Sequence, residues 1–216
     1  ALTLILLVSA LAATAAEPSL DEAFDTLKTY DDGQPNQALA VIQQYVGRVS
    51  KDPELGPRTA ERLAAILADP RTSMAAKLFA CEQLRLVAYD AQVPLFAKML
   101  DDPETADMAR IVLQTMPGED AARALIAALD RTTGDTLVGV INSVGARRAT
   151  GAVTQLAKLV RNSDPKISAA AGAARGRIGI YPAAGKPAAP RPKPMETGLA
   201  LTENVAGQGD RTPGNT

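Results

Sequence analysis

Histidine and tryptophan are absent from this 216-residue chain, and cysteine occurs only once. Without histidine the chain cannot form a Ser–His–Asp or Cys–His catalytic group, and it lacks the commonest protein ligand for transition metals. A single cysteine excludes an intrachain disulfide and a zinc site built from several thiolates. We therefore expect no metal, no cofactor and no catalytic residue, and predict that the chain is not an enzyme.

Aromatic residues are also scarce, and charge of either sign is not in excess. Phe and Tyr make up 3% of the chain, whereas apolar residues make up 46%, so a core must be built from Ala, Leu, Val and Ile. The 23 basic and 24 acidic residues leave a net charge of −1. This balance provides no overall field that would favour nucleic acid or an anionic membrane as a partner.

The two ends of the chain differ in composition from its middle. Residues 1–16 are uncharged and apolar and finish in small residues, which is typical of a cleaved secretory signal peptide and predicts a periplasmic or secreted location. An uncleaved anchor and a buried helix are the alternatives. Residues 181–216 begin with a proline-rich stretch, which predicts a disordered tail, with a proline-motif ligand for a partner domain as the alternative.

Between these ends, apolar residues recur at helical spacing. Four triads follow the i, i+3, i+4 pattern of an amphipathic helix, and their first members lie 33, 29 and 31 residues apart: Leu63, Ile66, Leu67; Phe96, Met99, Leu100; Leu125, Ala128, Leu129; Leu156, Leu159, Val160. A period near 30 residues predicts a repeat of antiparallel helix pairs. The helices are expected at 19–30, 36–50, 57–68, 73–87, 91–101, 104–116, 119–130, 135–146, 150–161 and 166–179.

Turn residues recur in phase with the triads. Asp69-Pro70, Asp102-Pro103 and Asp164-Pro165 each follow a triad, and Gly134-Asp135 takes the same place in the remaining repeat. Asp is a preferred N-cap and Pro fits the first helical position, so these pairs predict helix starts. Gly118, Gly145 and Gly179 are expected to end the preceding helices in a left-handed conformation.

The repeat resembles HEAT repeats, in the short bacterial form shared with phycobilin-lyase-like modules. The resemblance is carried by residues 93–116, 124–148 and 153–179, each of which has a helix, a turn with Asp or Asp-Pro, and a second helix ending near Gly. It implies an all-α, armadillo-like α-solenoid over residues 58–180, with residues 17–57 as an N-terminal helical cap. It implies nothing about activity.

Three sets of reactive side chains remain to be interpreted. Cys81 lies in an apolar context, which favours a buried thiol over a chromophore-attaching one. The acidic pairs Asp31-Asp32, Asp101-Asp102 and Glu119-Asp120 fall at expected helix ends, where carboxylates cap amides. Basic residues gather late in the array, with Arg147 and Arg148 in a turn expected between paired helices.

These observations predict a bacterial, exported, non-catalytic scaffold that binds another protein along its helical surface. The residues expected to contact a protein partner are Arg147, Arg148, Lys158 and Arg161. No small-molecule substrate is expected. The alternative is that the chain is the interaction module of a larger exported enzyme, such as a sugar-processing hydrolase or a haem-carrying protein.

Overall fold

The computed structural model describes residues 17–179, and this part of the chain is entirely helical, which confirms the all-α class. It contains ten α-helices, two short 3-10 turns and no strand in the described range. The α-helices are α1 (Leu20–Lys28), α2 (Gln37–Val49), α3 (Leu55–Ala68), α4 (Met74–Val87), α5 (Val93–Met99), α6 (Ala106–Thr115), α7 (Glu119–Ala128), α8 (Gly134–Arg147), α9 (Val153–Leu159) and α10 (Pro165–Gly179). The 3-10 turns η1 (Asp90–Gln92) and η2 (Thr150–Ala152) lead into α5 and α9.

Each expected helix is found, with ends that differ by at most three residues from the predicted ones. The largest difference, three residues, is at the start of α9, and both α5 and α9 are preceded by a 3-10 turn where an α-helix was expected. The signal-peptide prediction for residues 1–16 and the tail prediction for residues 181–216 lie outside the described residues.

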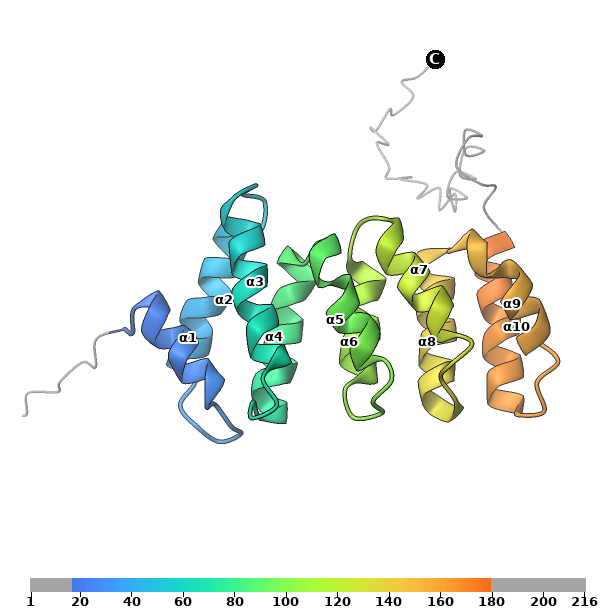
Figure 1. Ribbon diagram of the computed structural model, residues 1–216, viewed down its shortest axis with the longest axis horizontal. Helices are drawn as coiled ribbons and strands as arrows, with labels where there is room; N and C mark the ends of the chain where they lie inside the picture. The colour runs from blue at the N-terminus through green and yellow to red at the C-terminus, as the bar shows by residue number, and fades with distance from the viewer. Residues whose placement is uncertain (1–16, 180–216) are drawn as a thin grey trace, which may run out of the picture.

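The helices stand side by side along the longest axis of the molecule (Figure 1). Successive helices pack as five pairs, α1 with α2 through α9 with α10, which we call layers. The even-numbered helices form one continuous row, because each contacts the next from α2 to α10. On the other side α5 contacts α7, α3 contacts η1, and α7 contacts η2. Asp21 on α1 is joined to Arg62 on α3 by an ion pair of 2.9 Å.

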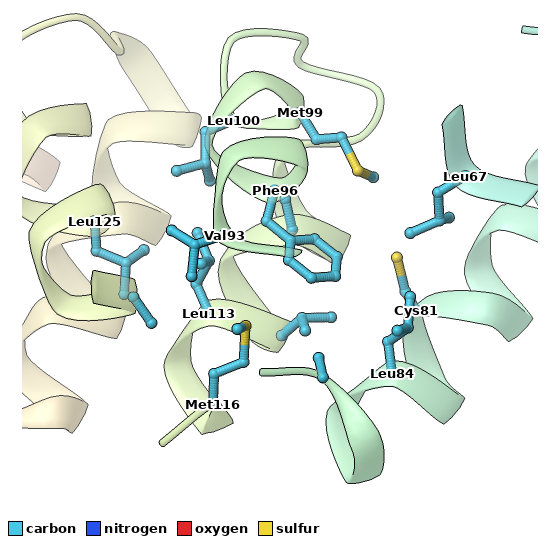
Figure 2. Close-up of a cluster of buried hydrophobic side chains, with 14 of the residues drawn as sticks. Leu67, Cys81, Leu84, Val93, Phe96, Met99, Leu100, Leu113, Met116 and Leu125 are labelled. Carbon is cyan, nitrogen blue, oxygen red and sulfur yellow. The ribbon is translucent and has the colours of Figure 1, made fainter. Parts of the chain in front are cut away.

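The core runs through all the layers as one continuous cluster of apolar side chains. Phe96 is fully buried at its middle, with side chains from α3, α4, α6 and α7 around it (Figure 2). The first three triads are buried throughout, and Leu100 and Leu129 are 1% and 3% exposed. In the fourth triad Leu156 is buried but Leu159 and Val160 are only half-buried. The described chain places no further layer over these two residues.

The Asp-Pro pairs begin a helix at only one of the three positions. Asp164 accepts a hydrogen bond from the Lys166 amide at 2.8 Å, and α10 starts at Pro165 as predicted. The other two predictions are wrong. Asp69 and Asp102 also each accept the backbone amide two residues ahead, but there the bond forms a turn and the helix begins only after it.

A threonine completes these two turns. The Thr72 hydroxyl donates to the Ile66 carbonyl at 2.8 Å, and the Thr105 hydroxyl donates to the Met99 carbonyl at 2.9 Å. Both threonines are buried, and each adds a second hydrogen bond to a carbonyl near the end of α3 or α5 that also accepts a backbone amide. Since the turn extends to the threonine, α4 starts only at Met74 and α6 only at Ala106.

The expected end of α8 at Gly145 is also wrong. The helix continues to Arg147, and Arg148 takes the left-handed conformation with φ of 53°. Gly145 is needed for a different reason, since a Cβ at this position would lie 2.9 Å from the Ala174 Cα of α10. The glycine thus allows α8 and α10 to approach closely. Gly118 has a φ of 85°, but it caps the start of α7 and does not end α6.

We expect Gly145→Ala to lower the free energy of unfolding by about 1–2 kcal/mol, because the added methyl group meets the backbone of α10. Gly172→Ala is the matched control: a Cβ there has no atom within 4 Å, so the higher helix propensity of alanine should stabilise the protein by about 0.5–1 kcal/mol. Urea unfolding, monitored by circular dichroism, measures the free energy of unfolding of both variants. If the two substitutions shift stability in the same direction, the close contact between α8 and α10 is not as described.

Candidate functional site

At least one carboxylate of each acidic pair is engaged in a contact within the chain. Asp31 accepts the Asp32 amide at 2.9 Å, and Asp101 forms an ion pair with Arg131 at 2.5 Å. Asp120 pairs with Arg123 within one turn of α7. Within residues 17–179, no group of three or more Cys, Asp or Glu side chains could hold a metal ion. These carboxylates shape turns and helix surfaces.

Cys81 lies at the base of a small groove between α4 and α6. The groove has a volume of about 210 Å³, and Leu78, Met108 and Ile111 line it with mostly apolar surface. The Cys81 side chain is itself only 3% exposed. Burial, together with the nearby Glu82 charge, raises the pKa of the thiol to about 12. The structure thus confirms the interpretation of Cys81 as a buried thiol.

We expect Cys81 to resist thiol reagents in the folded protein. A pKa of about 12, against the usual value of 9.0, lowers the thiolate fraction at pH 8 by about three orders of magnitude. Reaction with Ellman's reagent should therefore be slow in buffer and fast in 6 M guanidinium chloride, by about a thousandfold or more. Similar rates in both solvents would mean that the groove exposes the sulfur.

Arg147 is held within the fold by backbone carbonyls. Its Nη1 donates to the carbonyls of Leu113, Gln114 and Met116 at 2.7, 3.1 and 2.5 Å, and its Nη2 donates to Gly118 at 2.7 Å. Burial lowers the pKa of its guanidinium, although arginine keeps its charge. The guanidinium therefore binds the C-terminal end of α6, and most of its donors are used inside the chain.

The other three predicted partner-binding residues are exposed. Arg148 lies in the connection between the fourth and fifth layers, not within a helix pair as expected, and it too has an interaction within the chain. Lys158 is on α9, and Arg161 follows it in the turn before α10. The structure therefore places Lys158 and Arg161 together on the fifth layer, and Arg147 and Arg148 at the junction before it.

The fifth layer carries a further exposed cation and exposed apolar side chains beside the predicted partner-binding residues. Arg175 on α10 is exposed, and neither it nor Lys158 nor Arg161 has an ion-pair partner among residues 17–179. On the same layer Val153 is 42% exposed, and Leu159 and Val160 are half-buried. We call Val153, Lys158, Leu159, Val160, Arg161 and Arg175 the end surface. Leu159 and Val160 were expected in the core because they belong to the fourth triad, whereas Val153 belongs to no triad.

Charge is distributed unevenly along the row of layers. Residues 17–57 carry eight acidic and three basic side chains, a net −5. Residues 117–179 carry five acidic and nine basic side chains, a net +4. The first layers and the last layers lie at opposite ends of the molecule (Figure 1), so the chain has one acidic and one basic end.

Comparisons with protein-family models, with curated proteins and with solved structures found no match to this chain. Among residues 17–179, none of the helices combines the length and apolar character needed to cross a membrane.

Proposed function

We propose that this chain is a non-catalytic scaffold that binds an acidic protein partner through its end surface. The observation that carries the proposal is that the fifth layer has exposed Lys158, Arg161 and Arg175, none with an ion-pair partner among residues 17–179, and also has apolar side chains that no described layer covers. Interfaces of this kind combine a desolvated apolar centre with charges that set partner choice and association rate. A segment with carboxylates around one or two apolar residues would complement it.

We further propose that the layers are HEAT-like repeats of an α-solenoid. Hydrogen bonds between neighbouring layers support a repeat arrangement, because the donor and the acceptor lie about one repeat period apart in sequence. Arg131 Nη2 donates to the Ala97 carbonyl at 2.7 Å, and Arg147 Nη1 donates to the Leu113 carbonyl, both across 34 residues. Ser143 donates to Gln114 across 29 residues. Stability in such an array comes from nearest-neighbour contacts, which leaves a long surface for binding.

Export of the protein is part of the same proposal and depends on the apolar run at residues 1–16. A non-catalytic role is supported by the lack of histidine and by the contacts that engage at least one carboxylate of each acidic pair.

Binding of a defined acidic peptide tests the proposed function. A fluorescein-labelled peptide of alternating Glu and Leu is titrated with the protein, and its anisotropy is measured at 50 and 300 mM salt. We expect wild-type protein to bind more tightly at the lower salt concentration, because exposed charges are screened as salt rises. The double substitution Lys158→Glu with Arg161→Glu should weaken binding by about tenfold or more.

The matched control is Arg58→Glu with Arg85→Glu. This pair removes the same charge from exposed positions on α3 and α4, away from the end surface. The control protein should bind the peptide within about twofold of wild type. Equal losses in the two double variants would mean that binding follows net charge alone and would contradict the assignment to the end surface.

A further inference from the structure

The end surface has the form of an interrupted layer contact. Leu100 and Leu129 occupy the last position of their triads and are covered by the next layer, at 1% and 3% exposed. Val160 occupies the same position in the fourth triad but is half-buried. Since the triads recur every 29 to 33 residues, the surface that α9 presents is the one on which a further helix pair would stack.

The opposite end of the row is closed and acidic. The buried side chains of α1 are Ala23, Phe24 and Leu27. Asp25 forms an ion pair of 2.6 Å with Lys28 on the same helix, and their side chains are 72% and 59% exposed. The turn after α1 adds the exposed Asp31 and Asp32. The first layer therefore offers a polar surface of negative charge, in contrast to the open and basic fifth layer.

We propose that the end surface of one copy docks onto the acidic first layer of a second copy, so that the chain associates head to tail. The inference rests on the proposed function, because it names the acidic partner of the same end surface as another molecule of this protein. Opposite charge at the two ends favours this orientation over contacts between like ends.

Charge argues against the first part of the C-terminal segment as the occupant, whereas residues 195–216, with three acidic residues and one basic residue, are a competing occupant that would leave the protein monomeric. Residues 182–194 contain Lys186, Arg191 and Lys193 and no acidic residue. A segment of net charge +3 is repelled by Lys158, Arg161 and Arg175. The acidic first layer of a second copy has the complementary sign.

The geometry of the contact determines whether copies form a closed oligomer or an open series. The two docking surfaces are different and lie at opposite ends of the row, so the contact is heterologous. A heterologous contact that does not close into a ring adds copies in an open series. We therefore expect association to grow continuously with protein concentration, and to weaken when salt shortens the Debye length to a few ångström.

Sedimentation velocity of the full chain over a hundredfold range of concentration tests the proposal. At 20 mM salt the weight-average sedimentation coefficient should rise with concentration, and at 500 mM salt it should stay at the value for a monomer. Lys158→Glu with Arg161→Glu lowers the net charge of residues 117–179 from +4 to 0, and Asp25→Lys with Asp32→Lys raises that of residues 17–57 from −5 to −1, so each variant loses the charge of one end. Each double variant alone should remain monomeric, and an equimolar mixture of the two should associate again.

Matched controls separate end charge from net charge. Arg58→Glu with Arg85→Glu, and Glu82→Lys with Glu104→Lys, change the net charge by the same amounts at exposed positions within the row. Both controls should associate like wild type. Circular dichroism of every variant checks that the helices are retained; if an end variant unfolds, the single substitution Arg161→Glu replaces it and should weaken association by about threefold or more.

Wild-type protein that stays monomeric at every concentration would overturn head-to-tail docking, and so would a mixture of end variants that fails to associate. Neither result contradicts the proposed function if wild-type protein still binds the Glu–Leu peptide and the Lys158→Glu, Arg161→Glu variant does not. If the end variant and its charge-matched control bind the peptide equally, the proposed function is rejected. Self-association of wild-type protein in that case would not depend on the charges of the end surface, so head-to-tail docking as proposed would be rejected too.

Discussion

Replacing Arg147 with alanine should lower the free energy of unfolding by about 2–4 kcal/mol, a large effect for a partly exposed side chain. The guanidinium donates to four carbonyls at the end of α6 and in the connection to α7. The last carbonyls of a helix have no partner within it, so alanine would leave several of them with weaker or no hydrogen bonds. Arg147 also joins the third and fourth layers, since it belongs to α8.

Two further substitutions show whether the loss of stability in Arg147→Ala comes from the geometry of the guanidinium or from its charge. Arg147→Lys keeps the charge but cannot donate in the fork of a guanidinium, so it should recover less than half of the loss. Arg161→Ala removes an exposed arginine with no ion pair among the described residues, and should change stability by no more than about 0.5 kcal/mol. Chemical denaturation measures the free energy of unfolding of the three variants. If Arg147→Ala and Arg161→Ala prove equally mild, the four hydrogen bonds do not support the end of α6.

The second large effect is expected in the core. Leu100→Ala and Leu129→Ala should each cost about 2–5 kcal/mol, because each deletion leaves a cavity between two layers. Val160→Ala, at the equivalent position of the fifth layer, should cost about 1 kcal/mol or less, since that side chain is already half-exposed. The exposed Lys98 and Lys158 on the same stretches should tolerate alanine within about 0.5 kcal/mol.

The contrast between Leu129 and Val160 is the informative measurement. Both residues have the same place in the apolar pattern, so a pattern-based account predicts similar losses for both. The structure predicts that the loss in free energy of unfolding is several times larger for Leu129→Ala than for Val160→Ala, because only Leu129 has a described layer on each side. Equal losses at the two positions would mean that something covers Val160, which would also remove the apolar part of the end surface.

Local chemistry explains which features sequence reasoning could predict. The spacing of Phe96, Met99 and Leu100 repeats over four stretches, and an i, i+3, i+4 pattern places such residues on one face of a helix whatever their neighbours are. All ten helices and the burial of Cys81 follow from such patterns. The Asp-Pro turns were only partly predictable, because Thr72 and Thr105, which complete two of them, carry no distinctive local pattern.

The all-helical class, the positions of the helices and the opposite charges of the two ends were determined by the sequence itself, since propensity, periodicity and composition are local or additive properties. Tertiary structure decided the roles of individual side chains. Arg147 binds carbonyls about 30 residues away, and Val160 stays half-exposed where Leu129 is buried. Both outcomes depend on which layer lies next to the residue, and the residue's own neighbours in sequence do not specify that.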